Sequence, residues 1–312
     1  MSYEIITIGR LGIDLYPLES NVPLGSVTRF GRFLGGSAAN VAVAAARHSR
    51  KVALISRVGA DDFGRFLREE LERLGVDNEF VTAVEHLPTP ITFCEIHPPD
   101  HFPITFYRQP KAPDLEIRPD ELDLAAIRDA GLFWLTTTGL SAEPSRAAHH
   151  EALGVRDGSR LTILDLDYRE QFWPDPAEAR TAIGEVLPLV DVVVGNLAEC
   201  EVAVGEADPE AAAEALLGRG PRMAIVKLGP DGVLGVDATG SVTVSPVEVE
   251  VVNGLGAGDA FGGALCHGLL SGWPLQQTLE FANTAGAIVA GRLECSTAMP
   301  HTGEVLAAMP RR

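Results

Sequence analysis

The chain has 312 residues, and 46% of them are hydrophobic, so a large folded core can form. The formal net charge of −18 disfavours a surface that binds nucleic acid or an anionic membrane, since both require clustered lysine and arginine. We therefore expect a protein that binds small molecules and has no nucleic-acid or membrane partner. Any anionic ligand must be held by individual groups of its binding site.

The N-terminal region predicts a strand over residues 3–8, with no basic segment followed by an apolar one that would indicate a signal peptide. No apolar run reaches the length of a membrane span. The four cysteines are far apart and form no C-x-x-C pair, which argues against a zinc site or a disulfide framework. These features predict a reduced, cytoplasmic location.

Short apolar runs alternate with alanine-rich helical patterns along the rest of the chain. The predicted strands cover residues 132–136, 161–166, 192–194 and 223–227. A helix after nearly every strand requires crossover connections, and hence a mostly parallel sheet with helices on both faces. Ligands of such sheets bind at the carboxyl ends of the strands, so residues 165–169, residues 196–199 and the loop around Gly256 should share one cleft.

Two segments interrupt this alternation, at approximately residues 13–33 and 89–110. In the second, residues 91–95 and 104–108 alternate in polarity around a His-Pro-Pro-Asp-His turn, which predicts a β-hairpin. The hairpin either covers a substrate site or lies on the surface without a role in binding.

The run at residues 252–264 contains a glycine-rich turn that leads into a predicted helix. Backbone N–H groups of Gly256, Ala257 and Gly258 would face an anionic oxygen at the positive end of the helix dipole. Asp259 beside them would take a proton from an attacking hydroxyl. The alternative is a plain glycine-rich turn in which the aspartate balances the dipole.

A second glycine turn at residues 34–46 also leads into a helix of small residues. Together the two turns resemble the paired signatures of the ribokinase-like carbohydrate kinases, also called the phosphofructokinase-B family. The resemblance extends over nearly the whole chain and includes residues 9–14, 57–64, 196–199, 227–232 and 283–287. It implies a single kinase domain over residues 1–312, a three-layer α/β/α sandwich with a mostly parallel central sheet and a small β-sheet lid.

The same resemblance implies a sugar kinase that uses ATP and Mg²⁺, with a lid that covers the sugar and forms a homodimer surface. Asp259 would be the general base, and residues 256–258 would form the anion hole. Because the chain has no G-x-x-x-x-G-K-[ST] sequence, the helix N-terminus would replace a P-loop. An oxidoreductase is disfavoured because no G-x-G-x-x-G motif follows the first strand. A non-catalytic sugar sensor is the alternative from another class.

On the ATP side, Asn196 and Glu199 match the family's N-x-x-E motif, whose carboxylate helps to hold Mg²⁺, here through water. Alternatively, the pair is an ordinary helix start with an N-cap and a capping box. Lys227, Gly229 and Gly232 would form a turn beside the nucleotide, or only a tight turn between strands.

Three further residues complete the expected ATP contacts. Gly256 and Gly258 would contact the phosphates as part of the anion hole. Asn283 would face the adenine, or would merely satisfy nearby backbone groups.

On the sugar side, the resemblance implies that Asp14, Gly36 and Asn40 bind hydroxyls of the substrate. Alternatively, they are a carboxylate at a strand end, a turn glycine and a helix-cap asparagine without a role in binding. Arg108 and Arg169 would hold a substrate carboxylate, since a guanidinium is its preferred planar partner. Their alternative is a pair of solvated surface ion pairs.

Four stretches resemble the acid-sugar kinases of this family: residues 9–18, 106–108, 165–174 and 298–300. They imply transfer of the γ-phosphoryl group to a hydroxyl, expected at C6, of 5-dehydro-2-deoxy-D-gluconate. The alternative acceptors are 2-keto-3-deoxygluconate and another sugar or nucleoside.

Two positions depart from the family pattern. Glu170 replaces a proline expected in the acid-sugar kinases. Asn253-Gly254 replaces the Asp-Thr pair that usually belongs to a monovalent-cation site, so a dependence on K⁺ is left open.

Overall fold

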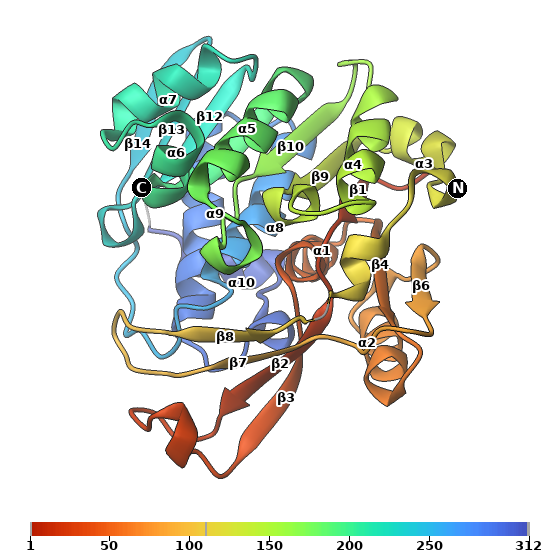
Figure 1. Ribbon diagram of the computed structural model, residues 1–312. Coiled ribbons are helices and arrows are strands. Elements are labelled where there is room, and N and C mark those ends of the chain that lie inside the picture. Colours follow the sequence, from red (N-terminus) through yellow and green to blue (C-terminus); the bar gives the residue numbers. More distant parts are fainter. Residues whose placement is uncertain (1, 110, 311–312) are drawn as a thin grey trace.

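A computed structural model describes residues 2–109 and 111–310 of the chain. Pro110, the last residue of the predicted lid, lies outside the described residues, as do Met1 and residues 311–312 at the ends of the predicted domain. Figure 1 shows a central sheet that is covered by helices, with a smaller sheet across one end.

The central sheet has ten strands in the described chain, and its core is parallel. In spatial order the strands are β14 (Gly240–Val244), β13 (Val233–Asp237), β12 (Met223–Lys227), β11 (Val192–Asn196), β10 (Leu161–Asp165), β9 (Leu132–Thr136), β1 (Ile5–Ile8), β4 (Val52–Gly59) and β5 (Val76–Asp77). β6 (Val81–Val84) also pairs with β4, and only β13 and β14 run antiparallel to their neighbours. The predicted parallel sheet is confirmed, with strand ends within two residues of the predicted ones.

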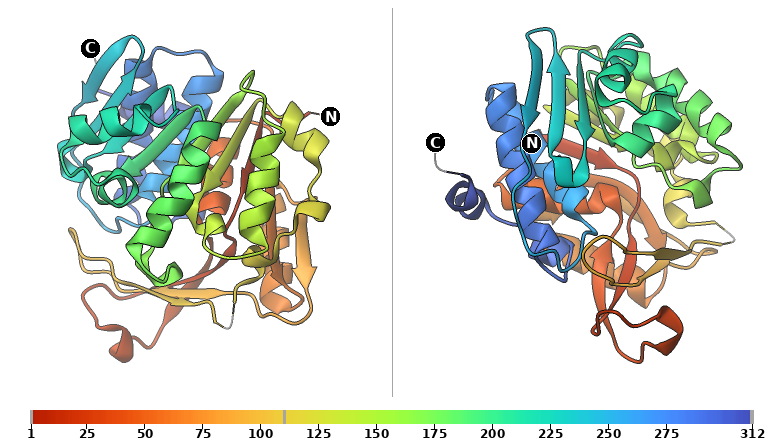
Figure 2. Two further views of the ribbon diagram at one scale, coloured as in Figure 1. Left: turned by 45° about the horizontal axis from the view of Figure 1, so that its top comes forward. Right: turned by 90° about the vertical axis from the view of Figure 1, so that its left-hand side faces the viewer.

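The helices form two layers, one on each face of this sheet (Figure 2). One layer contains α1 (Ser37–Arg47), α2 (Asp62–Arg73), α8 (Ala257–Leu270), α9 (Leu275–Ala290) and α10 (Thr302–Ala308). The other contains α3 (Leu124–Asp129), α4 (Ser145–Gly154), α5 (Pro176–Val186), α6 (Leu197–Val204) and α7 (Pro209–Leu217).

Alternating side chains of the strands explain the two layers. In β9, Trp134 is buried in the core beneath α1 and α8, whereas its neighbours Phe133 and Leu135 are buried beneath the opposite helices. Successive strand residues point to opposite faces, so a continuous apolar strand needs helices on both sides. The three-layer α/β/α sandwich is confirmed.

The smaller sheet consists of β3 (Phe30–Gly35), β2 (Gly12–Pro17), β7 (Ile91–Cys94) and β8 (Ile104–Tyr107), in that order. β7 and β8 form the predicted antiparallel hairpin, and β2 pairs antiparallel with β3 but parallel with β7. Because β2 follows the carboxyl end of β1 after a short turn, the small sheet lies at the edge where parallel strands carry their ligands.

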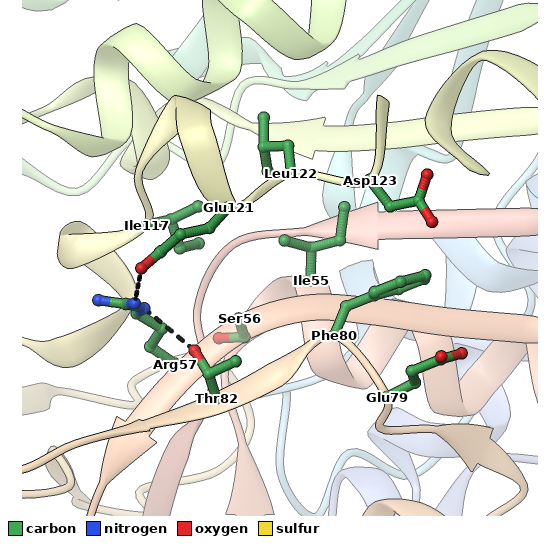
Figure 3. A pocket seen from close by; sticks show the side chains of 10 residues that line it. All are labelled: Ile55, Ser56, Arg57, Glu79, Phe80, Thr82, Ile117, Glu121, Leu122 and Asp123. Carbon is green, nitrogen blue, oxygen red and sulfur yellow. Dashed lines mark hydrogen bonds and ion pairs between the residues drawn. The ribbon is translucent and has the colours of Figure 1, made fainter. Parts of the chain in front are cut away.

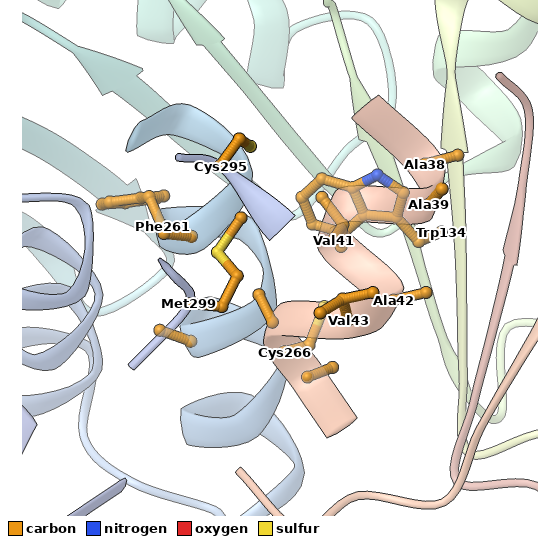
Figure 4. Close-up of a cluster of buried hydrophobic side chains, with 14 of the residues drawn as sticks. Ala38, Ala39, Val41, Ala42, Val43, Trp134, Phe261, Cys266, Cys295 and Met299 are labelled. Carbon is orange, nitrogen blue, oxygen red and sulfur yellow. The ribbon is translucent and has the colours of Figure 1, made fainter. Parts of the chain in front are cut away.

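Small residues let α1 and α8 pack closely against Trp134 (Figure 4). A Cβ added to Gly262 would lie 2.8 Å from the indole, and one added to Gly263 would lie 2.4 Å from the Cβ of Ala44. Larger side chains would force the helices apart. This packing brings the N-terminal ends of two helices together, although they are far apart in the sequence.

Among the described residues, no helix combines the length and the apolar character needed to cross a membrane.

Candidate active site

The Asp259 carboxylate lies in the first turn of α8 and is held by the start of α1. Its Oδ1 accepts a hydrogen bond of 2.7 Å from the Ser37 hydroxyl, and its Oδ2 accepts one of 2.8 Å from the Asn40 amide. Desolvation and the nearby Asp167 charge raise the pKa of Asp259, while these two donors oppose the shift. The predicted base is thus fixed in orientation.

The predicted anion hole coincides with the N-terminus of α8. Gly256 is the N-cap with φ of +83°, a left-handed conformation that favours glycine, and no described side chain caps the helix. A Cβ on Gly256 would lie 2.1 Å from the Cys295 Sγ. The helix starts at Ala257, so the N–H groups of its first turn lack intrahelical acceptors.

Lys227 adds a positive charge at this point. It ends β12, and its Nζ lies 3.4 Å from the position that a Cβ on Gly258 would take. The same Nζ is 4.0 Å from Oδ1 of Asp165, which ends β10. Burial raises the pKa of Asp165 to about 7. The carboxyl ends of two parallel strands thus place a buried ion pair beside the helix N-terminus.

Glu199 and Asn196 form a reciprocal capping box at the start of α6. Asn196 Oδ1 accepts a hydrogen bond from the Glu199 N–H at 2.9 Å, and Glu199 Oε2 accepts one from the Asn196 N–H at 2.8 Å. The structural alternative for this motif is therefore confirmed. The described residues contain no group of three or more His, Cys, Asp and Glu side chains that could hold a metal ion. The role of Glu199 toward Mg²⁺ stays a prediction.

Three of the predicted nucleotide residues line one hollow of about 500 Å³: Asn196, Lys227 and Gly229. Gly232 and Asn283 do not line this hollow; both contact the chain at the end of β14 or just after it. A Cβ on Gly232 would lie 2.1 Å from the Val244 carbonyl oxygen, and the Asn283 amide donates to the Ser245 carbonyl at 2.9 Å. Asn283 thus satisfies backbone, and its adenine contact stays a prediction.

The predicted sugar residues meet at the small sheet. Asp14, on β2, accepts a hydrogen bond of 3.0 Å from the Tyr16 hydroxyl, and desolvation raises its pKa to about 6. A Cβ on Gly35 would lie 2.0 Å from this carboxylate, so only glycine fits there. Gly36 has φ of +101° and packs on the Arg10 carbonyl, with 2.4 Å to an added Cβ. Asn40 is the neighbour already bonded to Asp259.

The two predicted carboxylate-binding arginines have protein partners. Arg108 Nη2 lies 2.7 Å from Asp114 Oδ2, and both side chains are buried, so the alternative of a solvated surface ion pair is wrong for Arg108. Arg169 Nη2 lies 2.7 Å from Asp167 Oδ1, and its Nη1 lies 3.7 Å from Glu199 Oε1. Arg169 therefore links the predicted sugar and phosphate sides, and substrate contact by either arginine stays a prediction.

Sequence reasoning missed Arg10, Ser37 and Asp167. Arg10 Nη2 donates to Asp167 Oδ2 at 2.6 Å, and both residues are buried. Burial alone would raise the pKa of Asp167, but the charges of Arg10 and Arg169 lower it. Arg10 and Asp167 lie within stretches that carry the family resemblance, yet their pairing over 157 positions has no local signal. Ser37 could have been noticed as the residue after Gly36 at a helix start.

A separate hollow lies between β4, β6 and the segment that precedes α3 (Figure 3). Its Arg57 guanidinium is held by Glu121 and by the Thr82 hydroxyl. None of the predicted site residues lines it, so it is distinct from the candidate active site.

Comparison with known proteins identifies the family of the chain. Residues 3–302 match the model of the pfkB family of carbohydrate kinases. A 5-dehydro-2-deoxygluconokinase of Clostridium tetani is 33% identical over 312 residues, which cover 97% of this chain and 91% of the relative.

Two solved structures have the same fold. A putative ribokinase II of E. coli, in complex with ATP and Mg²⁺, superposes with a TM-score of 0.89 at 23% identity and covers 99% of each chain. A fructokinase double mutant of Vibrio cholerae, bound to fructose, ADP and potassium, superposes with a TM-score of 0.87 at 24% identity and 99% coverage of each. The chain belongs to the pfkB family of carbohydrate kinases and is a phosphotransferase that acts on a sugar hydroxyl.

Proposed function

We propose that this kinase transfers the γ-phosphoryl group of ATP to the C6 hydroxyl of an acid sugar, with 5-dehydro-2-deoxy-D-gluconate as the substrate. The observation that carries the catalytic part is the Asp259 carboxylate, fixed by Ser37 and Asn40 beside an uncapped helix N-terminus. The choice of sugar is supported by the relatives' names, at about 30% identity over nearly the full chain.

In this proposal Asp259 accepts the proton of the attacking hydroxyl as the bond to phosphorus forms. Ser37 and Asn40 keep the carboxylate from rotating away, so little reorganisation accompanies the proton transfer. The N–H groups of Gly256, Ala257 and Gly258 stabilise negative charge on the transferring phosphoryl oxygens.

On the ATP side, the phosphates would extend from the hollow at Asn196 and Gly229 toward the α8 N-terminus. Lys227 lies between these features and would neutralise phosphate charge. The ATP-bound ribokinase-like neighbour that also holds Mg²⁺ supports both cofactors. When bound, Mg²⁺ would neutralise charge on the phosphates. Oε2 of Glu199 accepts the capping-box hydrogen bond, so Oε1 would contact a water molecule bound to Mg²⁺.

On the sugar side, Asp14 would accept hydrogen bonds from hydroxyls, and Gly36 would let backbone approach them. The Oδ1 of Asn40 is buried and has no hydrogen-bond partner among the described residues, so it is available to a substrate hydroxyl. Arg108 and Arg169 border the site, where positive charge favours an acid sugar. 2-Keto-3-deoxygluconate is the second candidate because it shares the carboxylate.

A potassium requirement does not fit these residues. Asn253 is fully buried, and its side-chain N–H donates to the Leu293 carbonyl at 2.8 Å. Its Oδ1 accepts the Leu255 N–H at 3.1 Å. An amide N–H thus stands where a carboxylate oxygen would face this carbonyl if residue 253 were aspartate, and we propose catalysis without K⁺ activation.

The outer face of the small sheet supports the proposal of a homodimer. Phe30, Phe93 and Tyr107 pack edge to face on it, with 5.4 Å between successive ring centroids, and Tyr107 is 63% exposed. Burying this face against a second copy would remove apolar area from water. Sedimentation should then show a dimer that Tyr107→Lys dissociates.

All four cysteines are free and buried, which supports a cytoplasmic location.

The proposed substrate is tested by ADP release with Mg-ATP and five acceptors: 5-dehydro-2-deoxygluconate, 2-keto-3-deoxygluconate, ribose, fructose and adenosine. We expect the first compound to have the highest kcat/KM, by at least about tenfold, which is 1.4 kcal/mol of discrimination. A lead for 2-keto-3-deoxygluconate would change the named sugar but keep the acid class. A lead for a neutral sugar or for adenosine would refute the acid-sugar assignment.

A further inference from the structure

The Arg10 side chain is buried next to the candidate sugar site. It follows β1, and its backbone carbonyl packs against Gly36. Burial raises the pKa of Asp14 and of Asp259, and the positive charge of Arg10 opposes the shift at both. The guanidinium is therefore within electrostatic reach of the hydroxyl-binding carboxylate and of the base.

Two aromatic rings lie close to this guanidinium. Its Cζ lies 5.7 Å from the ring centroid of Phe106, on lid strand β8, and 5.7 Å from that of Phe172, which follows β10. Both contacts are within the range of cation–π attraction. One contact comes from the lid and the other from the core. Arg10 therefore lies where the lid meets the core, which is where a substrate covered by the lid would bind.

The arginines of the site differ in how completely protein carboxylates neutralise them. Arg108 has Asp114 as its own buried partner. Arg10 and Arg169 instead share Asp167, whose Oδ2 accepts from Arg10 at 2.6 Å while its Oδ1 lies 2.7 Å from Arg169. The other carboxylate near Arg169, Glu199, is more distant at 3.7 Å and also faces Lys227. Arg10 is therefore the arginine of the site whose one ion-pair contact goes to a carboxylate that a second arginine also uses.

Arg10 also has an unused donor. Its side chain is only 9% exposed, and its buried Nε has no hydrogen-bond partner among the described residues. The Nε atoms of Arg108 and Arg169 also have no partner among the described residues. Arg108, however, has Asp114 as a partner of its own, and Arg169 has Glu199 as a second carboxylate nearby. A buried donor without an acceptor is unfavourable, and a ligand oxygen would satisfy it.

We infer that Arg10 binds the carboxylate of the acid substrate and is the residue that selects acid sugars over neutral ones. This inference rests on the proposed function. It assigns the enzyme's preference for acid sugars to Arg10 rather than to Arg108 or Arg169. Asp167 is a positioning residue: it holds Nη2 of Arg10 and leaves the Nε–H without a protein acceptor, free for an oxygen of the substrate. The substrate then spans from Arg10 to Asp259, with its hydroxyls on Asp14.

The test compares 5-dehydro-2-deoxygluconate with its carboxamide, which keeps the shape and removes the charge. For Arg10→Met we expect kcat/KM with the acid to fall about 100-fold or more, mainly through KM, and that with the carboxamide to fall less than about threefold. Arg10→Lys should give an intermediate loss with the acid, because it keeps the charge but loses the planar donor edge. The KM for ATP should stay within about twofold.

Arg57→Met is the matched control, because it also removes a partly buried arginine that is paired with a glutamate, in the separate hollow. It should leave the ratio of acid to carboxamide turnover unchanged. Arg10→Met/Asp167→Asn is the second variant, because it removes both members of the pair and so leaves no poorly paired carboxylate at residue 167. Arg169 loses its Asp167 contact in this variant but keeps Glu199. ATP binding measured by calorimetry shows that each variant is folded.

Equal losses with acid and carboxamide would show that Arg10 is only structural and would overturn the inference. A charge-specific loss in Arg108→Met but not in Arg10→Met would move the carboxylate to Arg108 and overturn it as well. The wild-type enzyme tests the proposed function separately: if it prefers neutral sugars, both the acid-sugar assignment and the Arg10 role are wrong. If it prefers the acid and Arg10→Met does not change that preference, only the Arg10 role is wrong.

Discussion

The Asp259 carboxylate accepts a 2.8 Å hydrogen bond from the Asn40 side-chain amide, although 219 positions separate the two residues in the sequence. The bond forms because α1 and α8 pack on the same face of the sheet through small residues at their contact. It joins the two glycine turns into one site. The base and the start of the sugar-binding helix are therefore positioned by a single packing arrangement.

Asp259→Asn should lower kcat by about 10³-fold, because an amide cannot accept the proton of the hydroxyl. Sugar and ATP binding should remain within about threefold, since Asn keeps the size and one acceptor oxygen. Turnover is measured by ADP release, and binding by calorimetry. Asp208→Asn, at the exposed N-cap of α7, is the matched control and should retain full turnover. A near-normal rate in Asp259→Asn would show that another group is the base.

Gly256→Ala and Gly258→Ala separate the fold of the anion hole from its function. At Gly256 the φ of +83° and the 2.1 Å approach to Cys295 Sγ both oppose a side chain, so we expect a loss of about 1–3 kcal/mol in stability and little activity. Gly258 has an ordinary helical conformation, so alanine there should keep or raise stability by up to about 1 kcal/mol.

The added Cβ at position 258 would nevertheless stand 3.4 Å from the Lys227 Nζ, where the phosphates are expected. We therefore expect the KM for ATP to rise severalfold in Gly258→Ala, with an unchanged melting temperature. Thermal unfolding and ATP titration of both variants check this contrast. Unchanged ATP kinetics in a stable Gly258→Ala protein would place the phosphates elsewhere.

We expect Asp14 to make sugar binding dependent on pH. Its pKa is about 6, raised from 3.8 chiefly by desolvation, so the carboxylate is protonated in the folded protein below about pH 6. A protonated carboxyl is a weaker acceptor for hydroxyls, and we expect the association constant for sugar to fall as the pH drops through about 6, approaching tenfold per unit.

Calorimetry in the Asp259→Asn background isolates this effect, because the base then has no proton to gain. The midpoint there should lie slightly below 6, since the Asp259 charge contributes to the raised pKa of Asp14. The folded protein binds the Asp14 proton more tightly than the unfolded chain, so this group favours folding below pH 3.8 and loses that contribution as the pH rises through 6. Asp14→Asn should accordingly abolish the acid limb of binding and raise stability at pH 8.

Local patterns predicted the parts of the molecule that local physics determines. The strand at Met223–Lys227 has the predicted bounds, and the capping box of Asn196 and Glu199 forms as its spacing indicates. The glycine turn at Gly256 begins a helix, as the small residues and the following aspartate suggest. Each of these features depends on neighbours within a few positions.

Contacts between distant segments could not be predicted in the same way. The pair of Arg10 and Asp167 depends on β1 and β10 lying on either side of β9, an order that no local pattern specifies. The buried partner of Arg108, Asp114, is only six positions away, but an arginine beside a surface-like hairpin gives no sign that both will be enclosed. Sequence alone thus predicted residues of the candidate site but not which of their charges neutralise each other.

Glu199→Gln tests the predicted contact with Mg²⁺. Glutamine still completes the capping box, so the start of α6 should stay intact. Loss of the negative charge should raise the Mg²⁺ concentration needed for half-maximal turnover by about tenfold. Glu201→Gln, on the same helix, is the control. An unchanged Mg²⁺ titration would mean that Glu199 only caps the helix.

Asn253 should make the enzyme insensitive to potassium, and the prediction has two parts. Turnover in K⁺ and in tetramethylammonium buffers of equal ionic strength should agree within about twofold, because the Asn253 amide already satisfies the Leu293 carbonyl.

Asn253→Asp would replace that donor with a carboxylate oxygen, so two acceptors would face each other in a buried site, at a cost of about 1–3 kcal/mol. A cation can bridge two such oxygens, and we expect K⁺ to restore part of the lost melting temperature in this variant only. Strong K⁺ activation of the wild-type enzyme would instead show that the cation binds in spite of the amide.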